Sequence, residues 1–384
     1  MEWKEVTLGE VSSKIGDGLH GTPKYDDEGS YYFINGNNLN CGKIIIKDDT
    51  KRVGIEEFVK NQKELNEQTI LVSINGTIGN VAKYNNEPCI LGKSACYINV
   101  VKEVDKEFIY YVLTSANFKR NITNEATGTT IKNVSLKQMR EYKFNIPCNI
   151  SDQRRIASIL SSLDRKIELN NKINADLEEM AQAIFKNWFV DFEPFKGGKF
   201  VDSELGMIPE GWKVGLLGEL CNFKRGKNLL TKNAIDEGVP VVAGGLEPSC
   251  YHNIANTGAP VITVSGSGAN AGFMRMYHVP VWASDCSFID ISCENFYFVY
   301  CFLKVNSKLL KHAQTGAVQP HVKPSDIHDF ELVIPDEESI YDFQDKVKPF
   351  FDRIASLQKE NSRLSSLRDT LLPRLMSGEL EVPE

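Results

Sequence analysis

The segment WKEVTLGE at residues 3–10 returns 209 residues later as WKVGLLGE at residues 212–219. A second block, TGTTIKNV at residues 127–134, corresponds to TGAVQPHV at residues 315–322 with an offset of 188. Matching blocks in the same order indicate a duplicated structural unit. Because the two offsets differ by 21, the second copy of the predicted domain is 21 residues shorter than the first.

A long amphipathic segment follows each copy. Residues 151–190 contain no proline or glycine, and apolar residues recur there every three or four positions. Residues 340–376 repeat this spacing, which is typical of helices with one apolar face. We therefore expect two long helices that pack on each other as an antiparallel coiled coil.

Polar residues interrupt the apolar stripe at the same position of both predicted helices, Asn170 and Asn361. A polar residue in such a seam costs stability and fixes register, so we expect the two to meet where the helices cross; the alternative is that both face solvent. The expected seam comprises Leu163, Asn170, Leu177, Ile354, Asn361 and Leu364.

Within each copy, short apolar runs alternate with Gly, Asn and Pro, which predicts short strands joined by turns. Helices are expected at residues 106–120 and 294–313. The fold class is α+β, with two tandem α/β domains in an internal repeat. The expected order is a domain at 1–150, a central helix at 151–192, a linker at 193–211, a domain at 212–335, and a helix with its tail at 336–384.

Composition excludes several classes of protein. No apolar run approaches the ~20 residues of a membrane span, and the nine cysteines form no C-x-x-C pair, so we expect a cytoplasmic chain with free thiols and no metal. The net charge of −7 argues against a partner made of nucleic acid. That charge lies on the predicted helices, however, and both predicted domains are neutral, so a local basic face remains available.

The candidate binding groups lie in two glycine loops and in two Thr-Gly loops, the latter at residues 126–133 and 314–321. The loop at residues 264–272 matches no phosphate-binding fingerprint, and its counterpart at 72–79 supports a glycine hairpin. Either the loops are structural turns, or their amides and hydroxyls contact DNA phosphates and base edges. The candidate DNA-binding residues are Lys24, Asn37, Asn38, Asn75, Thr77, Thr129, Thr130, Lys132, Lys227, Lys232, Ser265, Ser267, Asn270, Ala317, Gln319 and His321.

Catalytic motifs are missing from the sequence. The proline pair of an amino-methyltransferase box does not occur, and the acidic run after Pro335 has no lysine at the spacing of a nuclease motif. No nucleophile or carboxylate has a partnered motif either. We therefore expect a non-catalytic chain with no catalytic residue.

Three further segments are similar to one known family. The segments AQAIFKNWFVDF at residues 181–192, GMIPEGW at 206–212 and LLPRLMSGEL at 371–380 resemble the specificity subunit of type I restriction-modification enzymes. The resemblance covers the full length and includes residues 17–25, 269–272 and 282–285 within the domains.

This resemblance implies a function in bacterial defence. Each domain would be a target-recognition domain for one half of a bipartite, asymmetric DNA sequence, and the helices would set the gap and dock two methylation subunits. The partners would carry S-adenosylmethionine and methylate adenine, with ATP used by a restriction subunit in complexes that cleave DNA. This chain would bind no cofactor and no membrane. The alternatives are the specificity chain of a stand-alone or type IIB-like methyltransferase, and a scaffold that binds no DNA.

Overall fold

The structure is a computed structural model that describes residues 1–126, 132–314 and 320–382. It divides into two compact units. Unit 1 comprises Met1–Glu168 and Glu360–Glu384, and unit 2 comprises Leu169–Lys359. Each unit therefore contains one domain, part of the central helix and part of the C-terminal helix. No helix in the described part of the chain is both long and apolar enough to cross a membrane.

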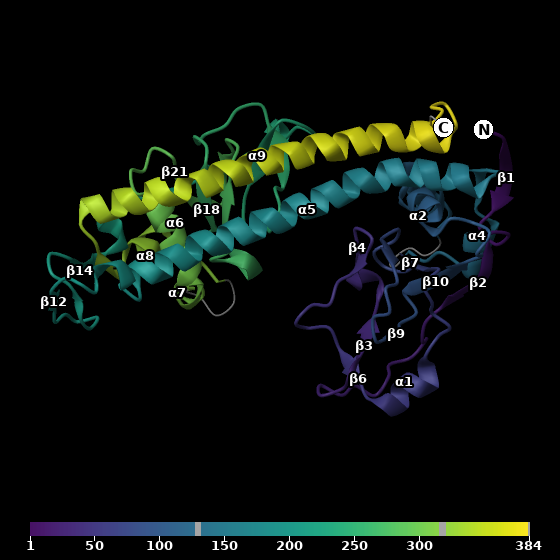
Figure 1. The fold of residues 1–384 in the computed structure, drawn as a ribbon, viewed down its shortest axis with the longest axis horizontal. Coiled ribbons are helices and arrows are strands. Elements are labelled where there is room, and N and C mark those ends of the chain that lie inside the picture. The colour runs from purple at the N-terminus through teal and green to yellow at the C-terminus, as the bar shows by residue number, and fades with distance from the viewer. Residues whose placement is uncertain (127–131, 315–319, 383–384) are drawn as a thin grey trace. The chain divides into compact units, whose positions relative to one another are not determined.

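Unit 1 is built on a four-stranded antiparallel sheet (Figure 1). Its strand order is β2 (Ser12–Asp17), β10 (Ala95–Val100), β7 (Thr69–Ser73) and β8 (Val81–Lys83). A second sheet has the order β6 (Arg52–Val53), β3 (Tyr31–Ile34) and β9 (Cys89–Leu91), with β3 and β9 parallel. The remaining strands form two pairs: β1 (Trp3–Thr7) with β11 (Lys143–Pro147), and β4 (Leu39–Asn40) with β5 (Lys43–Ile44).

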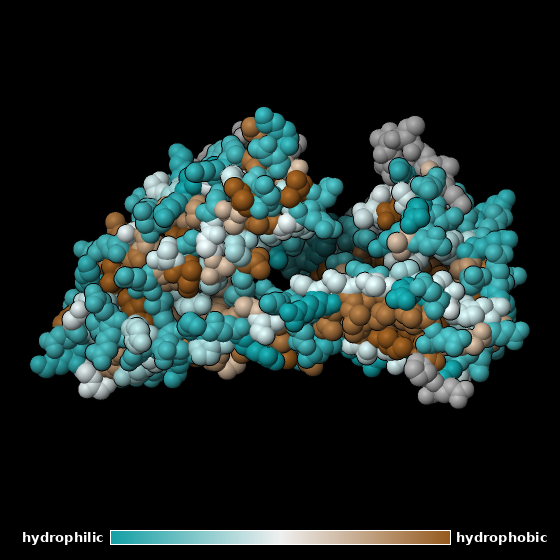
Figure 2. Space-filling model, turned by 90° about the horizontal axis from the view of Figure 1, so that it is seen from above, coloured by the Kyte–Doolittle hydropathy of each residue, from teal (hydrophilic) through white to brown (hydrophobic). Residues whose placement is uncertain are grey.

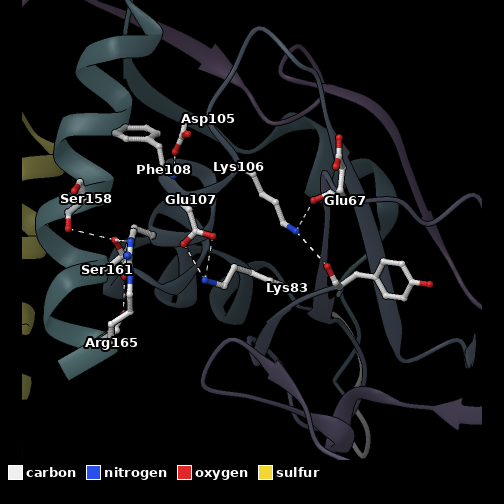
Figure 3. Close-up of polar contacts among 12 residues, drawn as sticks. Glu67, Lys83, Asp105, Lys106, Glu107, Phe108, Ser158, Ser161 and Arg165 are labelled. Atoms are coloured by element: carbon white, nitrogen blue, oxygen red, sulfur yellow. Dashed lines mark hydrogen bonds and ion pairs between the residues drawn. The ribbon is translucent and has the colours of Figure 1, made fainter. Parts of the chain in front are cut away.

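The helices of unit 1 are α1 (Ile55–Asn61), α2 (Lys106–Thr114), α3 (Ala116–Glu125), α4 (Leu136–Glu141) and the first part of α5 (Ile150–Phe189). Figure 3 shows how the first turn of α2 is fixed. The ammonium of Lys106, whose pKa is lowered by burial, donates to the carbonyl of Glu67 at 2.6 Å. Lys83 pairs with Glu107 at 2.8 Å, and Asp105 caps the helix by accepting from the amide of Phe108. These bonds attach α2 to the segment before β7 and to the end of β8.

Unit 2 repeats this plan element by element. Its four-stranded sheet has the order β15 (Lys224–Arg225), β21 (Cys286–Asp290), β18 (Val261–Ser265) and β19 (Met274–Tyr277). Its second sheet has the order β17 (Cys250–His252), β16 (Val239–Val242) and β20 (Trp282–Ala283). The strand β14 (Lys213–Leu216) pairs with β22 (Glu331–Ile334), and β12 (Phe200–Val201) pairs with β13 (Ile208–Pro209).

The helices of unit 2 are α6 (Phe296–Val305), α7 (Ser307–His312), α8 (Pro324–His328) and the first part of α9 (Glu337–Met376). They occupy the places of α2, α3, α4 and α5 in unit 1. Most of the length difference between the copies lies in one connection. Residues 35–68 join β3 to β7, whereas only residues 243–260 join β16 to β18.

One feature of the sequence-based prediction was wrong. The single helices expected at 106–120 and 294–313 are each broken into two. In unit 1 the break falls at Ser115, whose hydroxyl accepts from the amide of Phe118 at 3.2 Å. Serine favours this capping position because its side chain satisfies an amide that has no partner within the helix.

The two long helices are present and pack together, which confirms the α+β class with tandem domains. In unit 1, Asp164 of α5 pairs with Arg368 of α9 at 2.8 Å, and Lys166 pairs with Glu360 at 3.7 Å. Because Asp164 precedes Lys166 on α5 whereas its partner Arg368 follows Glu360 on α9, the two helices are antiparallel. Apolar side chains of these helices remain accessible in unit 1, since Leu163 and Leu364 are half-buried and Leu367 is 47% exposed. Figure 2 shows an apolar area on the surface of the molecule.

Each of the three family-like segments contributes buried side chains to the core of one unit. Phe185 and Phe189 of α5, four residues apart on one helix face, contact Phe343 of α9 with ring centroids 5.7 and 5.2 Å away. Phe189 also lies 5.8 Å from Trp212, at the start of the second domain. In unit 1, Leu372 and Leu375 of α9 are buried in the core against which Trp3 packs.

Candidate nucleic-acid interface

Several loops of unit 1 lie at the same end of its four-stranded sheet. Asp17 ends β2 and lies opposite Cys96, while Ser73 ends β7 and lies opposite Ala95, which begins β10. The loops that follow β2 and β7 and the turn that precedes β10 therefore leave the sheet at the same end. We call this the loop end of unit 1, comprising residues 17–20, 35–38, 73–79, 92–94 and 132–133.

The fold brings together two loops that the sequence suggested separately. The side chain of Asn75, in the first glycine loop, donates to Oδ1 of Asn133 at 3.1 Å. The amide of Gly76 donates to the carbonyl of Lys132 at 3.3 Å, and the amide of Val134 donates to that of Ile74 at 2.9 Å. The glycine loop and the segment after the first Thr-Gly loop thus form one surface.

Unit 2 contains the same junction. Ser267 forms a β-bridge with His321, and the amide of Gly268 donates to the carbonyl of Pro320 at 3.1 Å. The amide of Val322 donates to the carbonyl of Gly266, also at 3.1 Å. The loop end of unit 2 comprises residues 225–228, 243–245, 265–272, 284–285 and 320–321. Because the backbone contacts agree while the side chains differ, the repeat preserves a platform and varies what it presents.

The candidate residues of unit 1 differ in availability. Asn37, Thr77 and Lys132 are exposed at the loop end, and Asn75 is half-buried there. Asn38 is only 5% exposed, and its amide donates to the carbonyl of Ile45 and to Thr50 inside the unit. The exposed Lys24 precedes Tyr25, which forms a bridge to Val53 of the second sheet. Thr129 and Thr130 lie outside the described residues.

In unit 2, the structure gathers most of the candidates at the loop end. Lys227 is exposed, whereas Ser267, Asn270 and His321 are half-buried. Ser265 is 3% exposed and donates its hydroxyl to the carbonyl of Gly244. Lys232 is exposed in a separate short turn, Thr231–Asn233. Ala317 and Gln319 lie outside the described residues.

Sequence reasoning missed three basic groups at these ends. Lys93 is exposed in the turn between β9 and β10, and Arg225 is exposed at the end of β15. The side chain of Lys119 on α3 lies 3.4 Å from the place a Cβ would occupy at Gly79. The G-K-S turn at residues 92–94, between two apolar runs, could have identified Lys93 from the sequence. Lys119 could not be identified in this way, because its position depends on how α3 packs.

The chemistry of the loop ends suits recognition. In unit 1, Asp17 contacts His20 at 2.7 Å. In unit 2, burial raises the pKa of the Cys286 thiol, at the start of β21, to about 12, so this thiol is protonated at neutral pH. Among the described residues, no three His, Cys, Asp or Glu side chains gather to hold a metal. Exposed amides, hydroxyls, lysines and glycine-loop backbone can donate to phosphates and base edges.

The expected seam residues lie on both long helices. Asn170 is fully buried and Ile354 is 5% exposed, while the other four, Leu163, Leu177, Asn361 and Leu364, are half-buried. Leu177 packs against the core of unit 2. The burial of Asn170 contradicts the alternative in which both asparagines face solvent. The meeting of Asn170 with Asn361 stays a prediction.

Comparison with known proteins gives consistent similarities. The family model described as Type I restriction modification DNA specificity domain matches residues 1–179 and 209–364. The MjaIX specificity subunit of a type I restriction enzyme from Methanocaldococcus jannaschii is 29% identical over 389 residues, covering 94% of this chain and 87% of that relative. The HindI specificity subunit of a type I restriction enzyme from Haemophilus influenzae is 26% identical over 365 residues, covering 71% of this chain and 77% of its own.

A solved structure has the same fold. The S subunit of a type I restriction-modification system from M. genitalium matches with a TM-score of 0.56 and 22% sequence identity. The match covers 98% of this chain and 96% of that one.

Proposed function

The chain belongs to the type I restriction modification DNA specificity family, and on this premise we propose that it directs a methylation and restriction complex to a bipartite, asymmetric DNA target. Its similar relatives are specificity subunits of type I restriction enzymes. The observation that carries the proposal is the junction of glycine loop and Thr-Gly segment, which occurs at the loop end of both units.

The two units would read different sequences. Each loop end keeps the same backbone junction but presents different side chains, with Asn75 and Asn133 in unit 1 and Ser267 and His321 in unit 2. The connection after β3 is also much longer than its counterpart after β16. Because base edges are distinguished by their patterns of donors and acceptors, different side chains on one platform favour two different half-sites.

The long helices would dock the partners. The accessible apolar side chains of α5 and α9 in unit 1 provide a surface for a methylation subunit. The repeat offers equivalent helix segments in unit 2, which supports two such subunits. S-adenosylmethionine and ATP would bind to the methylation and restriction subunits, and this chain would act without a cofactor as a non-catalytic recognition subunit in the cytoplasm.

Two alternatives differ in their partners. The specificity chain of a stand-alone or type IIB-like methyltransferase would use the same loop ends with a different catalytic partner. A scaffold that binds no DNA is the other alternative. A methyltransferase gene with the proline box beside the gene for this chain would argue against the scaffold.

The deciding experiment is co-expression of the chain with its methylation partner, followed by genome-wide mapping of N6-methyladenine. We expect one motif with two unlike half-sites separated by a fixed gap. The partner expressed without this chain is the control and should leave that motif unmethylated. Methylation that has no sequence preference, or that does not depend on this chain, would contradict the proposal.

A further inference from the structure

Arg225 ends β15 at the loop end of unit 2, with its guanidinium held by a carboxylate. Its Nη2 donates to Oδ1 of Asp285, which lies in the turn between β20 and β21. The side chains remain 46% and 31% exposed, respectively. The pair therefore stands at the surface, among the loops that the proposed function assigns to DNA recognition.

Three chain segments fix this pair in place. The other carboxylate oxygen of Asp285 accepts a hydrogen bond from the hydroxyl of Ser267, and the amide of Gly266 donates to the backbone carbonyl of Asp285 at 3.1 Å. A Cβ at Gly266 would lie 2.7 Å from Nη1 of Arg225. The guanidinium thus lies directly over the glycine loop, in close contact with the backbone at Gly266.

Most donors of Arg225 remain available. A guanidinium has five N–H donors in a rigid planar fork. Among the described residues, the only hydrogen bond made by this guanidinium is the one from Nη2 to Asp285. Exposed ion pairs contribute little to folding stability, so stability alone gives no reason for this arrangement. A fork held on one side and open on the other is pre-oriented for a planar acceptor pair.

Unit 1 carries different chemistry at the equivalent positions. Asp17 ends β2 as Arg225 ends β15, and it lies opposite Cys96 as Arg225 lies opposite Ser287. The carbonyl of Ser94 accepts from the amide of Ile74, as that of Asp285 accepts from Gly266. An acid and a neutral hydroxyl in unit 1 thus replace the base and acid of unit 2. The Arg225–Asp285 ion pair is therefore specific to unit 2 and is not part of the backbone junction that the two units share.

We propose that Arg225 reads a guanine in the half-site of unit 2 through the major groove, and that Asp285 is the positioning residue that orients it. The inference rests on the proposed function. The N7 and O6 atoms of guanine are the acceptor pair that matches a guanidinium fork, and this is the commonest specific contact of arginine with DNA. A phosphate contact would also use the charge, but it would carry no preference for one base.

The test measures methylation by the complex of the full chain with its methylation subunit, on duplexes in which each target position is varied in turn. The variants are Arg225→Gln and Asp285→Asn. Lys213→Gln is the matched control, because Lys213, on β14 and outside the loop end, forms an exposed ion pair with Glu219 at 2.6 Å. We expect Arg225→Gln to lower the preference for guanine at one position of the second half-site about 10-fold or more. Asp285→Asn should lower it at the same position, and Lys213→Gln should leave it unchanged.

Modified bases identify the acceptor atoms. Replacing that guanine with 7-deazaguanine removes N7, so methylation by the wild-type complex should fall several-fold while the Arg225→Gln complex is unaffected. Inosine keeps N7 and O6 and lacks only the minor-groove amino group. It should therefore support methylation by the wild-type complex as well as guanine does.

Three outcomes would overturn the inference while leaving the proposed function intact. They are a second half-site without a G·C pair, an Arg225→Gln motif identical to that of the wild type, and an equal loss of methylation at every position, which a phosphate contact would produce. Failure of the proposed function is separate, because the wild-type complex would then methylate no bipartite motif. Methylation dependent on the first half-site, retained in each variant, shows that the variant is folded and assembled.

Discussion

Asn75 and Asn133 are hydrogen-bonded through their side chains at 3.1 Å, and this bond joins two loops that are 58 residues apart in the sequence. The equivalent residues of unit 2, Ser267 and His321, form a β-bridge at the same place. The loop ends are therefore composite surfaces, and a change in one loop should alter what the other presents.

The first prediction concerns this bond. Asn75→Ala and Asn133→Ala should each lower stability by about 1 kcal/mol, the usual net value of one hydrogen bond, and should relax recognition of the first half-site only. Because both changes remove the same bond, the double variant should lose less than the sum of the two. The measurement is methylation of targets altered in one half-site at a time. Asn145→Ala, at an exposed position of β11, is the control; strictly additive effects would count against a composite surface.

Gly18 has no room for a side chain. A Cβ there would lie 2.0 Å from the carbonyl oxygen of Leu91, a backbone atom that cannot move aside easily. Gly18→Ala should lower the free energy of unfolding by about 1–3 kcal/mol or more, the usual penalty for overpacking. The melting temperature should fall accordingly. Gly21→Ala, three residues later, meets nothing within 4 Å and should be neutral. Equal melting temperatures for the two variants would refute the close approach.

The buried thiol of Cys89 should make stability depend on alkaline pH. Burial raises its pKa from 9.0 to about 12, so above pH 9 the unfolded chain loses this proton while the folded chain keeps it. The folded state then binds more protons, and the contribution, complete below pH 9, is lost as the pH rises towards 12. The slope should reach about 1.4 kcal/mol per pH unit for one thiol.

Denaturant unfolding of the reduced chain between pH 8 and 10.5 measures this effect. Cys89→Ala should make the alkaline loss of stability less steep, whereas Cys148→Ala, at an exposed thiol, should not change it. The comparison uses slopes, because the cavity left at position 89 lowers stability at every pH. Parallel curves for the wild type and Cys89→Ala would rule out the buried thiol as a cause.

The central helix should act as a spacer. Four residues inserted between Asn171 and Lys172 of α5 add about 6 Å at ~1.5 Å per residue. We expect the mapped motif to gain gap length while both half-sites keep their letters. The same four residues inserted between Gly197 and Gly198, in the exposed connection after α5, should leave the gap unchanged. New letters in either half-site would contradict this division of labour.

The isolated chain should bind its target weakly. Its net charge is −7, so it lacks the basic excess that phosphate contacts require, and the methylation subunits would supply much of that contact. Binding measured by fluorescence anisotropy at physiological salt should tighten strongly when the methylation subunit is added. Sub-nanomolar specific binding by the chain alone would contradict this account.

Much of the fold was readable because it depends on local periodicity. The apolar spacing of residues 151–190 predicted α5, which occupies Ile150–Phe189. The candidate site was only partly readable. The sequence suggested the glycine and Thr-Gly loops separately, but it could not show that the amide of Asn38 is used inside the unit or that Arg225 stands over Gly266.

The sequence by itself determined the duplication, the unequal lengths of the copies and the presence of two long helices, because repeats and amphipathic spacing are local properties of the chain. Only the tertiary structure decided which helix segments complete the core of each unit. The end of α9 completes the core of unit 1 with Leu372 and Leu375, and the end of α5 completes that of unit 2 with Phe185 and Phe189. These packing partners lie far apart in sequence. The hydrophobic effect that brings them together is not directional, so which side chains meet depends on how well their shapes pack in the folded core.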